Sequence, residues 1–263
     1  MTLANEYKRQ FGWRAWPTIL DALPLAQGQT ILDLGCGVGD LAAEFVNRGS
    51  RVIGIEAHEE FLLEARSRRL SNAEFLTGDL RSLPDLGIQA DGIWCSFTAA
   101  YFPDLPTVLS PWTSNLKPGG WIALTEIDDL FGHEPLSIQT KELFKTYAEN
   151  ALAAGRYDFF MGRKLRGHLE ACGFTVLKVL TVDDQEFCFS GPARPEVVDA
   201  WRARFDRMQL LQDFCGENFD RVQEEFLTCL IREDHVSVSK VRCCIATISK
   251  FLLNVPHLEP SMP

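Results

Sequence analysis

A carboxylate followed by alternating glycines is the part of this sequence best suited to chemistry. The segment ILDLGCGVGD (residues 31–40) carries Asp33 in an apolar run and then has a glycine at every second position, Gly35, Gly37 and Gly39. Glycines let the backbone turn sharply and let a ligand approach closely, because no Cβ stands in the way. Free amides at the start of the following helix would add a polar cradle. We therefore expect a small organic ligand at this turn.

One candidate ligand is a nicotinamide dinucleotide. The relaxed fingerprint G-x-G-x-x-A begins at Gly37, and Glu56 lies 19 residues beyond it, close to where such sites place an acid for the ribose. Two other acids argue against this reading. Asp33 would oppose a pyrophosphate but suit a cation, and Asp40 stands where the strict pattern requires its third glycine.

Four motifs in order favour another family. The segments DLGCGVG, TGDL and LKPGG, together with the acid that ends RVIGIE, resemble the motifs of class I S-adenosylmethionine-dependent methyltransferases. The resemblance is strong over residues 28–127 and holds only in outline elsewhere. It implies that the cofactor S-adenosylmethionine, which becomes S-adenosylhomocysteine, contacts Asp33, Gly35, Gly37, Gly39, Glu56, Ala57, Asp79, Leu80, Ser96 and Phe97.

The resemblance also implies a role for each part of that site. Asp33 would help to hold the methionine ammonium group, and Glu56 would accept hydrogen bonds from both ribose hydroxyls. Asp79 would accept from the adenine amino group, while the Leu80 amide faces a ring nitrogen. The end of the fourth strand, at residues 96–97, would turn a backbone carbonyl toward the ammonium. The LKPGG turn helps to identify the family, but we expect it to shape the chain rather than touch a ligand.

The N-terminal stretch predicts a helix over residues 3–23 that could cover the cofactor as a lid. Tyr7, Gln10 and Arg14 lie three to four residues apart and would share one helical face. Arg14 could then pair with the methionine carboxylate, with Tyr7 beside it. A solvated helix packed by its tryptophans explains the same pattern.

Residues after the fifth strand are expected to face the methyl acceptor. His133, in TEIDDLFGHEP, has an unperturbed pKa near neutrality and is the candidate general base. Asp128 could hold a cationic amine, and Tyr157 and Phe160 could form a wall of the acceptor pocket. Each also has a structural explanation, as a loop histidine, a helix-entry acid or core aromatics. We find no obvious set of metal ligands.

The elements that must position these residues alternate along the chain. Expected strands are Thr30–Leu34, Arg51–Ile55, Ala73–Thr77, Asp91–Ser96, Gly120–Ile127, Phe174–Val182 and Val241–Leu253. Expected helices are Val38–Arg48, Glu59–Leu70, Leu105–Leu116, Ser137–Ala154, Gly162–Ala171, Glu196–Phe214 and Asn218–Arg232. This alternation predicts an α/β fold, a Rossmann-like, seven-stranded, mostly parallel sheet with helices on both faces.

The later helices predict a cap on a single domain, residues 1–263. Its core would span about 28–182 plus the final strand 241–253, and the helical insertion at about 191–235 would cover the acceptor. Loops at the carboxyl ends of such sheets usually build substrate sites.

Charge and cysteine usage limit the partners. The formal net charge of the 263 residues is -10, which disfavours nucleic acid and anionic membranes. The eight cysteines lack zinc spacing, and we expect them reduced, in a cytoplasmic monomer or homodimer. The favoured function is methylation of an O, N or C atom of a small-molecule acceptor. Alternatives are an NAD(P)-dependent oxidoreductase, a non-catalytic binding module, and a protein or nucleic-acid methyltransferase.

Overall fold

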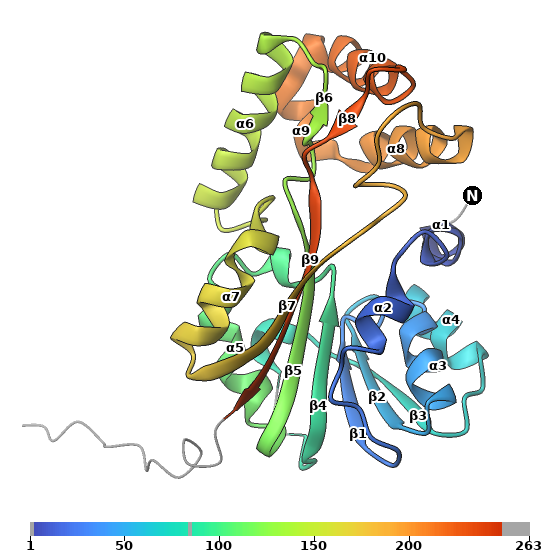
Figure 1. Cartoon of the computed structure of the whole chain (residues 1–263), viewed down its shortest axis with the longest axis vertical. Coiled ribbons are helices and arrows are strands. Elements are labelled where there is room, and N and C mark those ends of the chain that lie inside the picture. Colours follow the sequence, from blue (N-terminus) through green and yellow to red (C-terminus); the bar gives the residue numbers. More distant parts are fainter. Residues whose placement is uncertain (1–2, 84–85, 249–263) are drawn as a thin grey trace, which may run out of the picture.

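A seven-stranded sheet forms the centre of the protein (Figure 1). The computed structural model describes residues 3–83 and 86–248. The sheet order is β3-β2-β1-β4-β5-β9-β7. The strands are β1 (Thr30–Leu34), β2 (Arg51–Glu56), β3 (Ala73–Thr77), β4 (Ala90–Ser96), β5 (Leu116–Asp128), β7 (Phe174–Val182) and β9 (Lys240–Ile248). Strand β9 runs antiparallel to both its neighbours, and the pairs from β3 through β5 are parallel. The predicted Rossmann-like fold is confirmed.

Both faces of the central strands are buried, and apolar residues follow one another along them. Ile31 packs in one hydrophobic core and its neighbour Leu32 in the other, since successive strand residues point to opposite faces. The helices that cover these faces are α3 (Asp40–Asn47), α4 (Glu59–Ser67), α5 (Leu105–Thr113) and α7 (Met161–Ala171). This layering holds the parallel strands so that their carboxyl ends meet at one edge.

Four other helices gather beyond that edge (Figure 1). They are α6 (Ile138–Ala153), α8 (Pro195–Arg207), α9 (Gln209–Cys215) and α10 (Phe219–Leu230). A two-stranded sheet of β6 (His133–Glu134) and β8 (Val236–Ser237), which the sequence did not predict, joins them. We call these six elements the cap. Its interior is aromatic, and the rings of Phe131 and Phe144 stack at 4.3 Å.

Two expected helices are each broken in two. The N-terminal segment forms α1 (Leu3–Phe11) and α2 (Trp16–Leu20), with a turn at Gly12. The single helix expected at 196–214 is instead α8 and α9, because Met208 between them adopts φ -81° and ψ 63°, outside helical geometry. The last expected strand ends at Ile248, and its residues 249–253 lie outside the described part of the chain.

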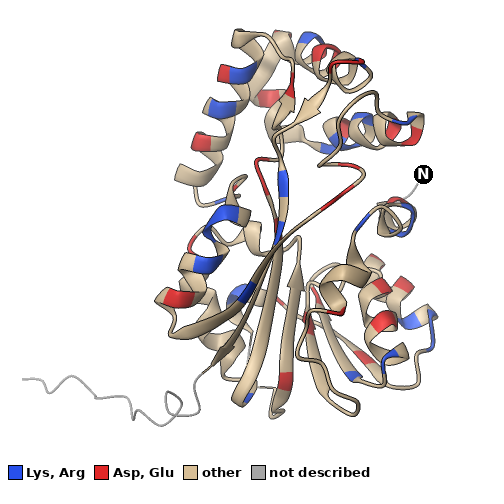
Figure 2. Cartoon of the chain, in the orientation of Figure 1, with Lys and Arg blue, Asp and Glu red and all other residues tan. Residues whose placement is uncertain are grey.

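Charge and length of the helices bear on possible partners. Figure 2 shows Lys and Arg interspersed with Asp and Glu along the helices of the cap and the sheet. Within residues 3–83 and 86–248, every helix is too short or too polar to span a lipid bilayer.

Candidate functional site

Asp33 lies at the base of the glycine turn with part of its carboxylate unsatisfied. The residue is 2% exposed, and its Oδ2 has no hydrogen-bond partner. Burial, and then the charge of Glu56, raise the pKa of Asp33 to about 7. An uncompensated buried carboxylate is costly. The arrangement therefore suits a cation that binds next to Asp33.

The glycines after Asp33 adopt backbone conformations that other residues avoid. Gly35 has φ +76°, and a Cβ there would lie 2.3 Å from Oγ1 of Thr98. Gly37 has φ +52° with no atom within 4 Å of its would-be Cβ, so open space borders the turn at this point. Gly39 precedes α3 with φ +76°. The turn is therefore tight on the protein side and open on the other.

Glu56 at the end of β2 connects this turn to the next one. Its Oε2 accepts a hydrogen bond from the Gly37 amide at 3.1 Å. Its Oε1 accepts from the amides of Ala57, at 2.9 Å, and His58, at 3.1 Å. The carboxylate is thus held in a fixed orientation with lone pairs to spare.

The predicted adenine contacts lie at the end of β3. Asp79 caps the short helix η1 (Leu80–Ser82) and accepts a hydrogen bond from the Arg81 amide at 2.9 Å. Its side chain remains 58% exposed. Leu80 is buried, and its carbonyl accepts from the Trp112 indole at 2.8 Å. A neighbouring adenine could therefore reach the Asp79 carboxylate.

Strand β4 ends in an unusual conformation at Phe97. Its φ is +51°, which is rare outside glycine. The Phe97 amide donates to the Thr125 carbonyl at 2.8 Å, and Trp16 packs against its ring. The carbonyl of Ser96 accepts from the Thr98 hydroxyl at 3.1 Å. The strand end is thus fixed beside the glycine turn, which Thr98 also touches.

Arg14 does not share a helical face with Tyr7, which corrects the expectation from their spacing. Helix α1 ends at Phe11, so Arg14 lies past the turn, where its backbone forms an isolated antiparallel β-bridge with that of Asp184. Its Nη1 donates to both Asp184 oxygens at 2.8 Å, and its Nη2 donates to Glu186 at 2.6 Å. The Arg14 guanidinium, which was predicted to bind the methionine carboxylate of the cofactor, therefore binds two carboxylates of the protein.

Tyr7 does lie on α1, at the side of the helix that faces α4. Its ring centroid is 5.4 Å from that of Phe61. The electrostatic neighbours of its hydroxyl include Glu56, the predicted ribose ligand. Tyr7 is therefore close to Glu56, and its role in a lid over the cofactor stays a prediction.

His133 lies in the interior of the cap, which corrects the expectation that it occupies a loop facing the methyl group. It is 1% exposed, and its ring packs against Trp201 and Phe226. Its Nδ1 lies 3.0 Å from Nε2 of His235. Burial, and then His235, lower the pKa of His133 to about 3. The geometry thus gives it a structural place between β6 and β8.

Asp128 is also engaged, which corrects its assignment to a cationic amine. It is buried, and its carboxylate pairs with Arg163 on α7 and, at 3.2 Å, with Arg242 on β9. Phe160 immediately precedes α7, and the Arg163 guanidinium lies 4.7 Å from its ring centroid. Asp128, Arg163 and Arg242 thus form one ion-pair cluster at the end of β5.

Tyr157 and two residues that sequence reasoning missed lie near the end of β4. The Tyr157 ring is 4.9 Å from that of Tyr101, at 81°. Glu126 is 1% exposed, and its Oε1 accepts from the Ala100 amide at 3.0 Å. Burial raises the pKa of Glu126 to about 7. An acid inside the apolar run IALTEI was the signal that could have identified it.

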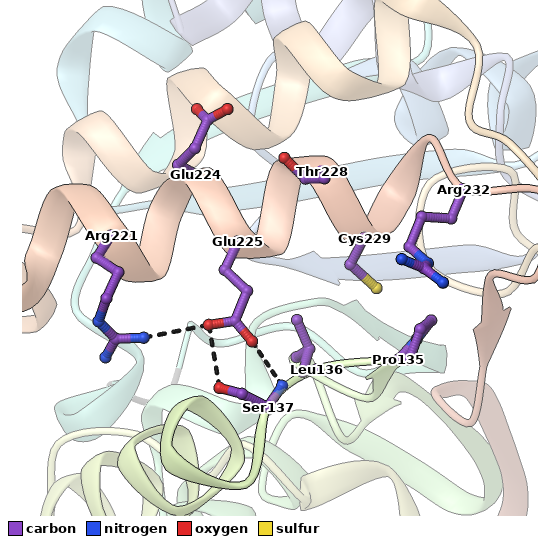
Figure 3. Close-up of a pocket in the computed structure, with 9 residues that line it drawn as sticks. All are labelled: Pro135, Leu136, Ser137, Arg221, Glu224, Glu225, Thr228, Cys229 and Arg232. Carbon is purple, nitrogen blue, oxygen red and sulfur yellow. Dashed lines mark hydrogen bonds and ion pairs between the residues drawn. The ribbon is translucent and has the colours of Figure 1, made fainter.

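A separate cavity of about 550 Å³ lies between α10 and the start of α6 (Figure 3). Its lining comes from residues 135–137 and 221–232 of the cap. Glu225 accepts from the Ser137 hydroxyl at 3.1 Å and pairs with Arg221 at 3.2 Å. Ser137, Arg221 and Glu225 therefore satisfy one another (Figure 3). Across the described residues, no three His, Cys, Asp or Glu side chains are grouped to hold a metal ion.

Comparisons with known proteins agree with the glycine-turn geometry. Residues 31–120 match the family model of a methyltransferase domain. The trans-aconitate 2-methyltransferase of Azoarcus sp. (strain BH72) is 34% identical over 113 residues, 42% of this chain and 44% of that protein. The nocamycin O-methyltransferase of Saccharothrix syringae is 35% identical over 114 residues, 41% of each chain. Each match therefore spans less than half of the relative's length.

A solved structure with a bound cofactor product shares the fold. It is the phosphoethanolamine N-methyltransferase 2 of Haemonchus contortus, in complex with phosphomonomethylethanolamine and S-adenosylhomocysteine. The TM-score is 0.58 at 19% identity, over 94% of this chain and 57% of that one.

Proposed function

Because the chain belongs, through the methyltransferase domain at residues 31–120, to the class I S-adenosylmethionine-dependent methyltransferases, we propose that it methylates a small molecule. The acceptor atom would be O, N or C of a metabolite or natural product. The observation that carries this proposal is the unsatisfied carboxylate of Asp33 beneath an open glycine turn. It is the feature that a bound amino-acid ammonium group would complete.

The residues of the turn fit S-adenosylmethionine. Asp33 would hold the ammonium group, Glu56 the ribose hydroxyls and Asp79 the adenine amino group. A cation next to Asp33 would also offset the repulsion between Asp33 and Glu56, which contributes to the raised pKa of Asp33. The cofactor supplies a methyl group that its sulfonium already activates.

The chain would contribute alignment and exclusion of water. The cap brings apolar side chains over the carboxyl edge of the sheet, and a dry pocket favours an in-line geometry of acceptor and methyl group. The N-terminal segment, with Tyr7, would act as a lid. A general base is needed only where the acceptor must lose a proton.

The choice of a small molecule rests on charge and on the relatives. A net charge of -10 disfavours nucleic acid. The names of the two curated relatives refer to small molecules, trans-aconitate and nocamycin. We also propose that the protein acts in the cytoplasm as a monomer or homodimer.

Calorimetry with S-adenosylhomocysteine and, separately, NADH tests the function. We expect S-adenosylhomocysteine to bind at micromolar strength, about -8 kcal/mol, and NADH not to compete. The variant Asp33→Asn keeps the shape of the side chain and removes its charge, so it should weaken binding. NADH binding in place of S-adenosylhomocysteine would establish the oxidoreductase alternative and overturn the proposal.

A further inference from the structure

Three tyrosines and one arginine from four different elements are electrostatic neighbours near the carboxyl edge of the sheet. Tyr7 comes from α1, Tyr101 from η2 (Ala99–Tyr101), Tyr157 from the segment before α7, and Arg204 from α8. The charge of Arg204 acts on all three tyrosine hydroxyls, and the hydroxyls act on one another. Tyr101 and Tyr157 are in ring contact at 4.9 Å. These four side chains are called the tyrosine–arginine cluster below.

The cluster borders the proposed cofactor site. Glu56, the predicted ribose ligand, is an electrostatic neighbour of Tyr7 and Tyr101. Glu126 at the end of β5 is a neighbour of Tyr101 and Tyr157. The cluster therefore lies between the sheet edge and the cap, where an acceptor would have to be placed.

Arg204 has hydrogen-bond capacity that the described residues do not use. Its Nη2 donates to Oε1 of Glu186 at 2.6 Å, while Oε2 of the same carboxylate accepts from Arg14 at 2.6 Å. Glu186 is therefore shared between two guanidinium groups. The Nε of Arg204 has no partner in the described chain, and its side chain is 24% exposed. A guanidinium carries five N–H donors, so Arg204 can bind a second acceptor group.

The tyrosines add donors of the same kind. Burial raises the pKa of Tyr7, Tyr101 and Tyr157, so each hydroxyl keeps its proton at neutral pH. Each is then an O–H donor on which the positive charge of Arg204 acts.

The carboxylates around the cluster are held by other groups. Glu56 accepts from the amides of residues 37, 57 and 58. Glu126 accepts from the amides of Ala100 and Ile127, and Oε1 of Glu6 pairs with Arg207 while its Oε2 has no hydrogen-bond partner in the described chain. The cluster itself consists of one guanidinium and three protonated hydroxyls, all of which can donate. Such a set of donors favours an anionic acceptor over an ammonium one.

We propose, on the basis of the methyl transfer proposed above, that the acceptor is a small organic carboxylate, which Arg204 binds with the hydroxyls of Tyr7, Tyr101 and Tyr157 around it. A planar carboxylate matches the planar guanidinium. An anion at this position would also be attracted to the cationic methyl donor. Arg204 is then the residue that selects the charge of the substrate.

Calorimetry on the protein saturated with S-adenosylhomocysteine tests the charge selection. The probes are tricarballylate and benzoate, each against its matched amide. We expect the acids to bind and the amides to bind at least tenfold more weakly, because a charge-assisted hydrogen bond contributes a factor of about 10–100. Equal binding of acids and amides, or no binding of either acid, would overturn the proposal.

Variants on one helix separate substrate binding from a structural role. Arg204→Gln should weaken acid binding by about 10–100-fold, whereas Arg204→Lys, which keeps the charge, should recover part of it. Arg202→Gln removes an exposed arginine from the same helix and should change nothing. If Arg204→Gln lowers thermal stability but leaves acid affinity intact, Arg204 only fastens α8 to Glu186, and the proposal is wrong.

Two further measurements keep this proposal distinct from the proposed function. S-adenosylhomocysteine should bind Arg204→Gln and the wild type equally. If neither protein binds S-adenosylhomocysteine, the proposed methyltransferase function is wrong, which is a different outcome from failure to bind a carboxylate. A cell extract provides the direct test. After removal of proteins, it is separated into anionic, cationic and neutral fractions, and each fraction is incubated with the protein and S-adenosylmethionine that carries a deuterated methyl group. A deuterium-labelled methylated product from the anionic fraction supports the proposal. A labelled product from the cationic or the neutral fraction refutes it.

Discussion

Glu56 combines two tasks at the scale of a single residue. Its carboxylate fixes the amides of Gly37, Ala57 and His58 and lies where a ribose diol would bind. Glu56→Ala should therefore weaken S-adenosylhomocysteine binding by about 2–4 kcal/mol, because charge-assisted hydrogen bonds are lost. Glu60→Ala, at an exposed position on α4, is the matched control. An unchanged dissociation constant in calorimetry would show that Glu56 serves the fold alone.

Asp33 should make cofactor binding depend on pH. Its pKa is raised from 3.8 to about 7 in the folded protein, so below pH 7 the carboxyl is mostly protonated and cannot attract an ammonium group. Binding of S-adenosylhomocysteine should thus tighten as the pH rises from 5 to 7, by up to about tenfold per unit. Titrations of the wild type and Asp33→Asn at each pH provide the check. Parallel curves for both proteins would assign the dependence to another group.

Arg14 fastens three segments together at the scale of elements. Its guanidinium joins the N-terminal segment to Asp184 and Glu186, between β7 and α8, and lies over the rings of Phe97 and Phe187 at 5.2 and 4.5 Å. The N-terminal segment and α8 thus share one ion-pair cluster through Glu186, and the tip of β4 adds a cation–π contact at Phe97.

Loss of Arg14 should cost more stability than cofactor affinity. Arg14→Gln leaves two buried carboxylates with one fewer cation, so unfolding in urea should require about 3–5 kcal/mol less. The surface pair of Arg48 and Asp21 supplies a control, since Arg48→Gln should cost at most about 1 kcal/mol. A large loss of S-adenosylhomocysteine affinity in a well-folded Arg14→Gln would restore its assignment to the methionine carboxylate.

A histidine pair ties β6 to β8. Nδ1 of His235 lies 3.0 Å from the Gly191 carbonyl, so it carries the proton and donates. Nε2 of His235 must then accept from Nδ1 of His133. Both rings are neutral in this arrangement. A second proton on His133 would go to Nε2, which is buried without a hydrogen-bond partner in the described chain, so the charged ring is disfavoured.

This pair should make the cap sensitive to acid. The pKa of His133 falls from 6.5 to about 3 on folding, so its contribution is present above pH 6.5 and is lost progressively as the pH falls toward 3. Urea unfolding of wild type and His133→Phe between pH 7 and 4 measures the difference. The stability of His133→Phe should fall less steeply, and identical slopes would contradict the neutral pair.

The whole molecule connects the cap to the sheet through its strands. Strand β5 leads directly toward β6, and β8 leads into β9 beside it. Ligand binding at the edge between them should therefore stabilise both parts together. At 100 times its dissociation constant, S-adenosylhomocysteine should add about 2.7 kcal/mol to the free energy of unfolding. Calorimetric scans should show one transition shifted upward, whereas a shift in only one of two transitions would show that the parts unfold separately.

Local sequence determined the sheet and the cofactor turn. Strands β1, β3 and β7 begin and end where the sequence predicted. Strand β1, in the middle of the sheet, is almost wholly buried and nearly continuously apolar, whereas the edge strands β3 and β7 are only partly buried. The sequence also predicted that Asp33 and Glu56 lie near each other, since parallel strands bring their carboxyl ends to one edge. The prediction of the methyltransferase family was possible because its motifs lie on these local elements.

Only the tertiary structure decided the partners of the long polar side chains. Spacing assigned Arg14 to the cofactor, but a turn at Gly12 ends the helix and sends Arg14 to carboxylates 170 and 172 residues away. His133 was assigned from its place after β5, but it pairs with a histidine 102 residues distant. Arg204 gave no local signal, because its surroundings come from four separate elements. Contacts across such distances depend on how the cap folds over the sheet, and no local pattern encodes them.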